Sequence, residues 1–275
     1  MKVIRWALSR SAFAALTAFL GAFFAMPMLW LLLAPFNARG TLAVEWPRPF
    51  SLANFQAVFA NTFAMRALGN SLIIAGGTML TVTLVATLAA YALSRAEVPY
   101  YDLLTYGLIL FSSVVTGMAA MVPIFLLANA LGLVDTHLGV IMAFTGGLVP
   151  TAIFILRDFV EGLPRSYEES AMVCGANPWQ MVRDVVMPLL RPGMMVVGIW
   201  SFVQAWGAFL IPFVLLRSPE RMPAAIAIYS FYTEAGTPIL TLTSAYALLY
   251  ALPVLALYLF VNARYGFRFF GGLKR

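Results

Sequence analysis

Long apolar segments separated by short polar ones run through the whole chain of 275 residues. A helix needs roughly 20 apolar residues to cross the hydrocarbon core of a bilayer. Windows of that length predict six transmembrane spans, at 11–34, 71–94, 103–129, 138–160, 193–216 and 241–262. We therefore expect an all-α integral membrane protein in which residues 1–275 form a single transmembrane domain, with a longer loop at 161–192.

The basic residues predict how these spans are oriented. Six spans place both termini on the same side of the membrane. With the N-terminus inside, the cytoplasmic segments hold 12 of the 17 Lys and Arg residues, namely Lys2, Arg5, Arg10, Arg95, Arg157, Arg165, Arg183, Arg191, Arg264, Arg268, Lys274 and Arg275. Because positive charge accumulates on the cytoplasmic side, we expect both termini and the loop 161–192 to lie in the cytoplasm.

Composition then removes several classes of protein. The chain is 62% hydrophobic and 10% charged, and its mean hydropathy is +0.90, which indicates a membrane protein surrounded by lipid. The net charge of +6 comes from residues that flank the spans, so no nucleic-acid surface is indicated. The single cysteine and single histidine lie far apart in the sequence and offer no metal or catalytic constellation, so we do not expect an enzyme.

The cytoplasmic loop has local order of its own. Ser166 and Glu169 have the spacing of a capping box, which predicts a short helix that begins at this point. Gly175 can adopt the left-handed conformation that ends such a helix. The loop is therefore predicted to hold a structured element in addition to connecting two spans.

A second short helix is predicted directly after that glycine. Asn177 precedes Pro178, and Gln180 follows three positions later, which is the pattern of a capped helix with proline at its first position. We expect this helix to run from Pro178 until Pro188, where the proline ends it. One of its faces carries an apolar stripe that suits a groove on a soluble partner, formed by Trp179, Val182 and Val186.

These residues carry a family resemblance. The order Glu169-Ser170-Ala171, Gly175 and Val185-Val186-Met187-Pro188 resembles the cytoplasmic Glu-Ala-Ala loop of the permeases of ATP-binding-cassette importers, in which a proline follows the glycine at the same separation. Other segments resemble the carbohydrate permeases related to the second membrane subunit of the maltose importer, namely Pro49–Phe55, Asn70–Leu72, Ala90–Arg95 and Gly271–Lys274. Two positions depart from that family pattern: Cys174 stands where Asp is common, and Trp206-Gly207-Ala208-Phe209 where Trp-Asn-Glu-Phe is usual.

The resemblance implies a type I importer permease fold in the cytoplasmic membrane of a prokaryote. It implies a heterodimer with a second, homologous permease, two ATPase subunits and an extracytoplasmic sugar-binding protein as partners. No cofactor is expected on this chain, since it contains no phosphate-binding loop motif, and ATP and Mg²⁺ are expected on the ATPase subunits. The outer loop 217–240 is expected either to reach the binding protein or to be a mobile connector.

In such permeases the cytoplasmic loop forms a coupling helix that docks into a cleft of the ATPase. Glu168 and Glu169 suit an Arg of that partner, although the alternative is a solvated helix start favoured by the dipole. The resemblance assigns the coupling role to Glu168, Glu169, Ser170, Ala171, Met172, Gly175, Ala176, Trp179 and Pro188.

Polar and aromatic residues inside the spans are candidates for the solute pathway, because burying a polar group in lipid is costly. Aromatic rings beside hydrogen-bonding groups suit sugars. The candidates are Asn70, Ser113, Thr116, Asn129, Gln204, Trp206, Tyr246 and Tyr250. The alternative is that the small polar residues hold helices together and the aromatic ones anchor span ends.

The imported solute is expected to be a mono-, di- or oligosaccharide or a derivative. Another polar solute such as a glycerol phosphate stays open, although Arg or Lys inside the spans would favour a phosphate. A secondary transporter is the less favoured alternative, because such proteins place ionisable residues inside the membrane. The interiors of the predicted spans contain essentially no Asp, Glu, Lys or Arg.

Overall fold

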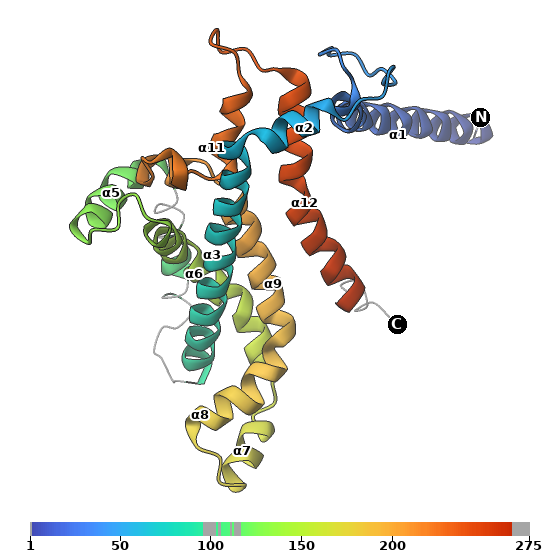
Figure 1. Cartoon of the computed structure of the whole chain (residues 1–275). Coiled ribbons are helices and arrows are strands. Elements are labelled where there is room, and N and C mark those ends of the chain that lie inside the picture. The colour runs from blue at the N-terminus through green and yellow to red at the C-terminus, as the bar shows by residue number, and fades with distance from the viewer. Residues whose placement is uncertain (1, 96–102, 104–105, 111, 113–116, 266–275) are drawn as a thin grey trace. The chain divides into compact units, whose positions relative to one another are not determined.

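A computed structural model describes residues 2–95, 103, 106–110, 112 and 117–265 (Figure 1). The described residues are almost entirely helical, with two isolated β-bridges, Asn37 with Phe50 and Tyr232 with Pro238. The chain divides into two compact units, one formed by Met1–Met65 with Ala227–Arg275 and the other by Arg66–Ile226.

Five helices of the described residues are long and apolar enough to cross a membrane. Their spans are Phe13–Phe36, Thr62–Arg95, His137–Glu161, Pro178–Trp206 and Leu240–Ala263. The predicted span 103–129 is described only in part, and its described end holds a shorter apolar helix, Met118–Ala130. The helical, membrane-spanning character of the chain is therefore confirmed, while the sixth span and the orientation stay predictions.

The first unit contains α1 (Lys2–Leu33), η1 (Ala34–Phe36), α2 (Ala53–Ala60), η5 (Ile228–Phe231) and α12 (Leu240–Tyr265). Helix α12 packs against α2 and η1, and the ring of Phe36 stacks on that of Phe50 at 4.9 Å. Tyr246 of α12 is fully buried, and its hydroxyl donates to the Ala64 carbonyl at 3.3 Å. None of the membrane-spanning window of α1 is buried within this chain.

The second unit is built on α3 (Thr62–Arg95, of which residues 66–95 belong to this unit), α6 (His137–Glu161) and α9 (Met187–Trp206). Its other elements are η2 (Met118–Ala120), α5 (Met121–Ala130), α7 (Ser166–Val173), α8 (Pro178–Gln180), η3 (Met181–Val186), α10 (Leu210–Leu215), η4 (Pro219–Arg221) and most of α11 (Ala224–Ala227). The long helices pack closely where small residues allow it, as is common in membranes. Gly193 of α9 lies against the ring of Phe159 of α6, and the hydroxyls of Thr81 and Thr145 join α3 to α6 at 2.7 Å.

The predicted span 193–216 was wrong in its bounds. The helix that covers the first part of this span begins at Pro178, within the loop 161–192, and ends at Trp206, and α10 is a separate short helix. Gly207 caps the end, with its N–H directed to the carbonyls of Val203 and Ala205. Hydropathy alone counts the apolar residues on both sides of this cap as one window, since glycine and alanine do not interrupt an apolar run.

Candidate functional site

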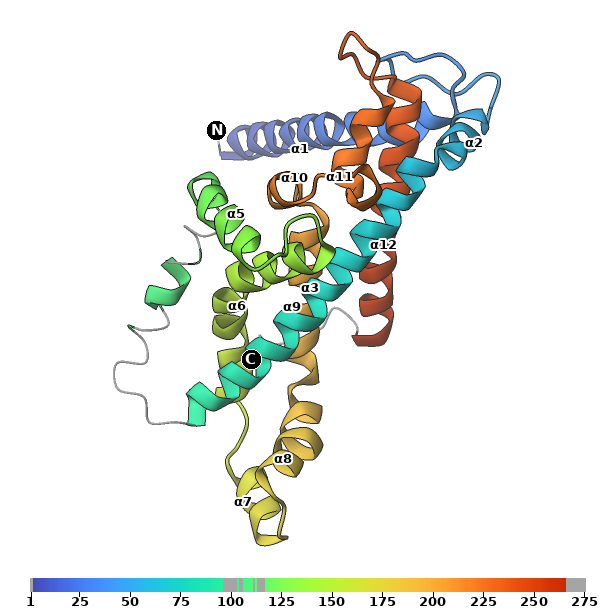
Figure 2. The ribbon, with the colours of Figure 1, turned by 60° about the vertical axis from the view of Figure 1, so that its left-hand side comes forward.

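The loop 161–192 forms two short helical segments, α7 and α8, at one end of the second unit (Figures 1 and 2). Helix α7 ends in a left-handed turn at Gly175, whose φ is +85°. The N–H of Gly175 donates to the Met172 carbonyl at 2.9 Å, and the N–H of Ala176 donates to the Ala171 carbonyl at 3.0 Å. These two bonds are those of a Schellman motif, so the predicted helix end at Gly175 is confirmed.

The predicted capping box at the start of α7 is wrong. Ser166 is the first residue of the helix, and the capping position is taken by Arg165 without a side-chain hydrogen bond. Arg165 already has helical dihedral angles, φ −58° and ψ −23°, and its carbonyl accepts from the N–H groups of Glu168 and Glu169. The helix therefore starts one residue too early for the Ser166 hydroxyl to act as a cap.

The second segment begins as predicted. The Asn177 side chain accepts from the Gln180 N–H at 2.8 Å, and the Gln180 side chain accepts from the Asn177 N–H at 3.0 Å. Both halves of the capping box are present, with Pro178 at the first helical position.

Pro188 does not end this helix, contrary to the prediction. Residues Met181–Val186 form a π-helical segment, and the chain continues through Met187 into α9 and the membrane span. The Met187 N–H donates to the Val182 carbonyl, five residues back. This wider turn lies directly before Pro188. The proline therefore follows a segment whose backbone hydrogen bonds already differ from the regular i−4 pattern of an α-helix. The second segment and the span are one continuous helical element.

Three large apolar side chains of the helix pair formed by α7 and α8 are exposed, and polar or charged residues of the pair such as Glu169 and Gln180 are exposed as well. The exposed fractions are 56% for Met172, 89% for Val173 and 66% for Trp179. Glu169, Ser170 and the turn around Gly175 are exposed as well, while Val186 of the predicted stripe is buried. Exposed large apolar side chains close to a charged one are typical of a surface that binds another protein.

Glu168 has a different environment from its neighbour Glu169. It is only 8% exposed, and its Oε1 accepts from Nε and Nη2 of Arg95 at 2.8 and 2.5 Å. Its Oε2 accepts from the Tyr91 hydroxyl at 3.0 Å. Sequence reasoning missed Arg95 and Tyr91 as parts of this site, because they lie on α3 and are 73 and 77 residues away from Glu168.

The predicted pathway residues are distributed over several helices. Asn70 of α3 is 7% exposed and donates to the carbonyls of Glu220 and Met222 at 2.8 and 3.0 Å, so it holds the loop after α10. Trp206 is buried at the end of α9, where its ring stacks on that of Phe202 at 5.5 Å. Asn129 on α5 and Gln204 on α9 are exposed. Tyr246 and Tyr250 lie on α12. Ser113 and Thr116 lie outside the described residues.

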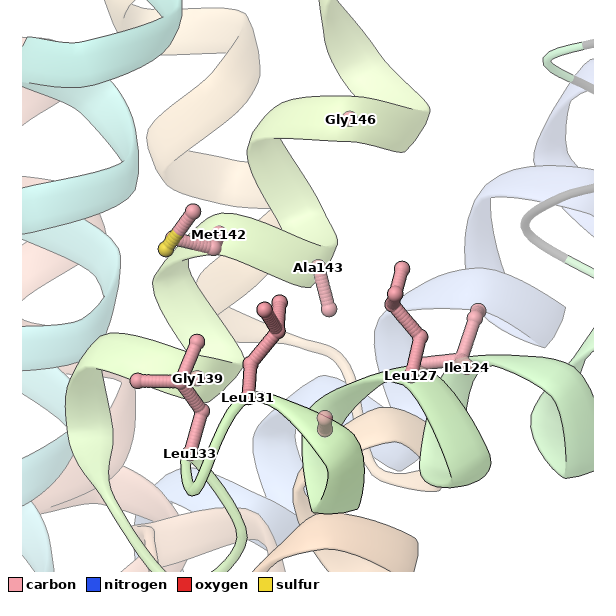
Figure 3. A pocket seen from close by; sticks show the side chains of 9 residues that line it. Ile124, Leu127, Leu131, Leu133, Gly139, Met142, Ala143 and Gly146 are labelled. Atoms are coloured by element: carbon pink, nitrogen blue, oxygen red, sulfur yellow. The ribbon is translucent and has the colours of Figure 1, made fainter.

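An open hollow of about 210 Å³ lies between α5 and the first turns of α6 (Figure 3). It is lined by Ile124, Leu127, Ala128, Leu131, Leu133, Gly139, Met142, Ala143 and Gly146. These residues offer no polar side chain that could pair with the hydroxyls of a sugar. The hollow contains none of the predicted pathway residues and does not have the chemistry of a site for a polar solute.

On the side of the second unit where α5 and α6 are connected, Asp135 organises the connection. Its side chain accepts from the Ser218 hydroxyl at 2.5 Å and from the N–H groups of Ser218 and Arg217 at 3.0 Å. These bonds, together with the charge of Arg221, lower the pKa of the Asp135 carboxyl from 3.8 to about 2. The segment 217–221 is therefore fixed to the α5–α6 connection.

The family model that matches the chain is described as "Binding-protein-dependent transport system inner membrane component" and covers residues 83–266. The maltodextrin transport system permease protein MdxG of Bacillus subtilis is 28% identical over 223 residues, which are 81% of this chain and 80% of that protein. The diacetylchitobiose uptake system permease protein NgcG of Streptomyces coelicolor is 31% identical over 202 residues, 71% of this chain and 66% of that protein.

Among solved structures, a chain of a bacterial ABC transporter involved in the import of the acidic polysaccharide alginate has a similar fold. The TM-score is 0.79 at 20% identity, and the match covers 94% of this chain and 97% of the other.

Proposed function

This chain belongs to the family of inner-membrane components of binding-protein-dependent transport systems, and we propose that it is the permease subunit of an ATP-binding-cassette importer for a saccharide. The relatives MdxG and NgcG are named for the transport of maltodextrin and diacetylchitobiose, both of which are saccharides. That naming supports a sugar over a glycerol phosphate, and family membership supports an ATP-driven importer over a secondary transporter.

The observation that carries this proposal is the exposed helix pair between the end of α6 and the start of α9. It presents Met172, Val173 and Trp179 around the Gly175 turn, with the Glu169 carboxylate exposed beside them. A patch of this kind suits a cleft of a soluble subunit that contains an Arg, which would bind Glu169 through charge-assisted hydrogen bonds. The family resemblance assigns a coupling role to this loop. We propose that the exposed residues of the loop carry that role.

The continuous helix from α8 to α9 suggests how such docking reaches the membrane. If closure of two ATPase subunits moves the helix pair, the movement enters α9 directly, because only the π-helical segment Met181–Val186 separates α8 from the span. The transporter would then alternate between inward-open and outward-open states, driven by ATP and Mg²⁺ on the ATPase subunits.

The remaining parts of the proposal follow from the charge distribution and the family. The chain would form one membrane domain with six spans and both termini in the cytoplasm of a prokaryote, paired with a second homologous permease. Solute would arrive from an extracytoplasmic binding protein. The pathway would use polar and aromatic residues near the end of α9, with Gln204 and Trp206 as its first candidates, and Ser113, Thr116, Asn129, Tyr246 and Tyr250 as further ones.

The proposal is tested in vesicles that contain the chain, its partner permease and the ATPase subunits, with the binding protein and a panel of saccharides outside. Glu169→Gln is expected to lower ATP-dependent import by roughly tenfold or more, because a desolvated charge pair at an interface would lose one partner. Trp179→Ala is expected to do the same by removing an aromatic anchor. Glu161→Gln is the matched control, since Glu161 is an exposed acid at the end of α6 outside the helix pair.

Three outcomes would contradict the proposal. Import that needs no ATPase subunits and follows an ion gradient would identify a secondary transporter. Import of glycerol phosphate in place of every saccharide would support that alternative solute. Full ATP-coupled import by both Glu169→Gln and Trp179→Ala would show that the exposed face is not the docking surface.

A further inference from the structure

The buried acid of the loop ties the helix pair to α3. Glu168 uses both carboxylate oxygens for side chains of the last turn of α3, one for Arg95 and the other for Tyr91. Tyr91 and Arg95 are four residues apart, so both project from one face of α3. The exposed fractions of the two charged side chains are only 18% for Arg95 and 11% for Glu168, which sets this ion pair apart from surface pairs of little energetic weight.

Two of these three residues, Arg95 and Tyr91, also contact the segments on either side of α7. Arg95 Nη2 donates to the carbonyl of Leu163, in the turn between α6 and α7, at 3.4 Å. The Tyr91 hydroxyl lies 3.6 Å from the sulfur of Met181, the first residue of the π-helical segment. The Tyr91–Arg95–Glu168 cluster therefore joins α3 to the turn before α7, to α7 itself and to the start of the π-helical segment that follows α8.

Helix α3 is suited to carry a displacement over a long distance. It contains no proline, whereas the alternative route through the other helix passes the π-helical segment, Pro188 and Pro192. From Arg95 back to Asn70 it extends roughly 37 Å at 1.5 Å per residue. At that far end Asn70 holds two carbonyls of the outer loop, and the Ser71 hydroxyl accepts from the Ala224 N–H at 2.8 Å.

We propose that the Tyr91–Arg95–Glu168 cluster is a joint through which movement of the cytoplasmic helix pair displaces α3, and that α3 thereby transmits the nucleotide state to the outer loop at 220–224. The inference rests on the proposed function in one respect, since the helix pair must be the surface that the ATPase moves. Arg95 and Glu168 are then positioning residues. They contact neither the solute nor ATP, and they couple the nucleotide state of the ATPase to the solute side of the permease.

The test places a reporter at the outer end of α3. Gly69 is exposed, and a Cβ added at this position would meet no heavy atom within 4 Å, so Gly69→Cys in a Cys174→Ser background adds a thiol without a clash. The rate at which a water-soluble maleimide alkylates this thiol is compared between nucleotide-free complexes and complexes trapped with ATP and vanadate. Glu168→Gln, the double variant Glu168→Arg with Arg95→Glu, and the control Glu161→Gln are each measured in this background, in complexes whose other subunits lack cysteine.

With the cluster intact, the alkylation rate is expected to differ between the two nucleotide states. Glu168→Gln should abolish that difference and lower the number of solute molecules imported per ATP by about tenfold, within the usual range of coupling free energies, while ATP hydrolysis continues. The charge-exchanged double variant should restore both quantities, and Tyr91→Phe, which removes one hydroxyl and disturbs folding least, should reduce both partially.

Two results would overturn the inference. One is a nucleotide-dependent alkylation rate that is the same in Glu168→Gln as with the cluster intact. The other is an absence of any nucleotide effect on the thiol when the cluster is intact. Failure of the proposed function would look different, because neither import of any saccharide nor ATP hydrolysis stimulated by the binding protein would then be seen with the unaltered chain.

Discussion

Replacing Gly175 by alanine tests the geometry of the turn between α7 and α8, which we propose as part of the docking surface. Gly175 has a φ of +85°, and the two hydrogen bonds of the Schellman motif depend on this conformation. The left-handed region costs a residue with a side chain about 1–2 kcal/mol. No heavy atom lies within 4 Å of the position that the new Cβ would take, so no steric clash adds to this cost.

This backbone cost sets the size of the expected effect. A change of 1–2 kcal/mol alters the ratio of the native turn to other conformations by roughly 5–30-fold. If the native turn is the form that docks, the apparent affinity of the ATPase subunits for the permease falls by at most that factor. The assay adds increasing amounts of purified ATPase subunits to inside-out vesicles that contain the permease, with the binding protein and saccharide in their interior, and measures the stimulated ATP hydrolysis.

Gly175→Asn is the matched control, because asparagine enters the left-handed region more readily than alanine and should lose much less affinity. Equal affinities for the alanine variant, the asparagine variant and the unaltered chain would refute the importance of the turn. A loss far beyond 30-fold would refute the account in another way, since backbone strain alone cannot produce it.

Three further predictions concern stability, orientation and pH. In α6, Gly139→Ala should destabilise the protein by about 1–3 kcal/mol in thermal unfolding, because the new Cβ would lie 2.3 Å from the carbonyl oxygen of Leu133. Gly146→Ala is the control: its Cβ would meet no heavy atom within 4 Å, so this change should be neutral or slightly stabilising. Cys174, the only cysteine and exposed, should react with an impermeant maleimide in inside-out vesicles and not in right-side-out ones; the reverse labelling would contradict the predicted orientation. Asp135 has a pKa below its usual value, so its stabilising effect is complete above about pH 4 and disappears as pH falls towards about 2; Asp135→Asn should therefore lower the melting temperature at neutral pH, and its difference from the unaltered chain should shrink over that acidic interval.

Local chemistry in the loop 161–192 could be predicted well from the sequence. The capping box of Asn177 and Gln180 and the left-handed turn at Gly175 each depend on residues within a few positions, and both are confirmed. Ser166 shows the limit of this reasoning, because its capping role depended on the conformation of Arg165, which the motif does not specify. Hydropathy located the five long apolar helices of the described residues, but it did not show that α9 ends at Trp206, because the apolar run continues beyond Gly207.

Contacts between distant parts of the chain could not be predicted in the same way. The pairing of Glu168 with Arg95 joins positions 73 residues apart, and nothing local in either segment indicates it. The acid pair was interpreted as two equivalent surface charges, whereas packing against α3 makes Glu168 an internal residue and leaves Glu169 exposed. Asn70 was selected because a polar residue in lipid is costly, and the structure gives it backbone partners at Glu220 and Met222 that the sequence does not identify.

The π-helical segment Met181–Val186 also determines the angle about the helix axis between the side chains of α8 and those of α9. It lies between Trp179 on the exposed face and the residues that α9 presents inside the membrane, all on one continuous helix. One residue corresponds to about 100° of rotation in an α-helix. A single-residue deletion in the segment would therefore turn the docking face by about that angle relative to the span, while an exchange of one apolar residue for another would leave the angle unchanged. The length of this segment, more than the identity of its side chains, determines which face of the span responds when the loop is moved.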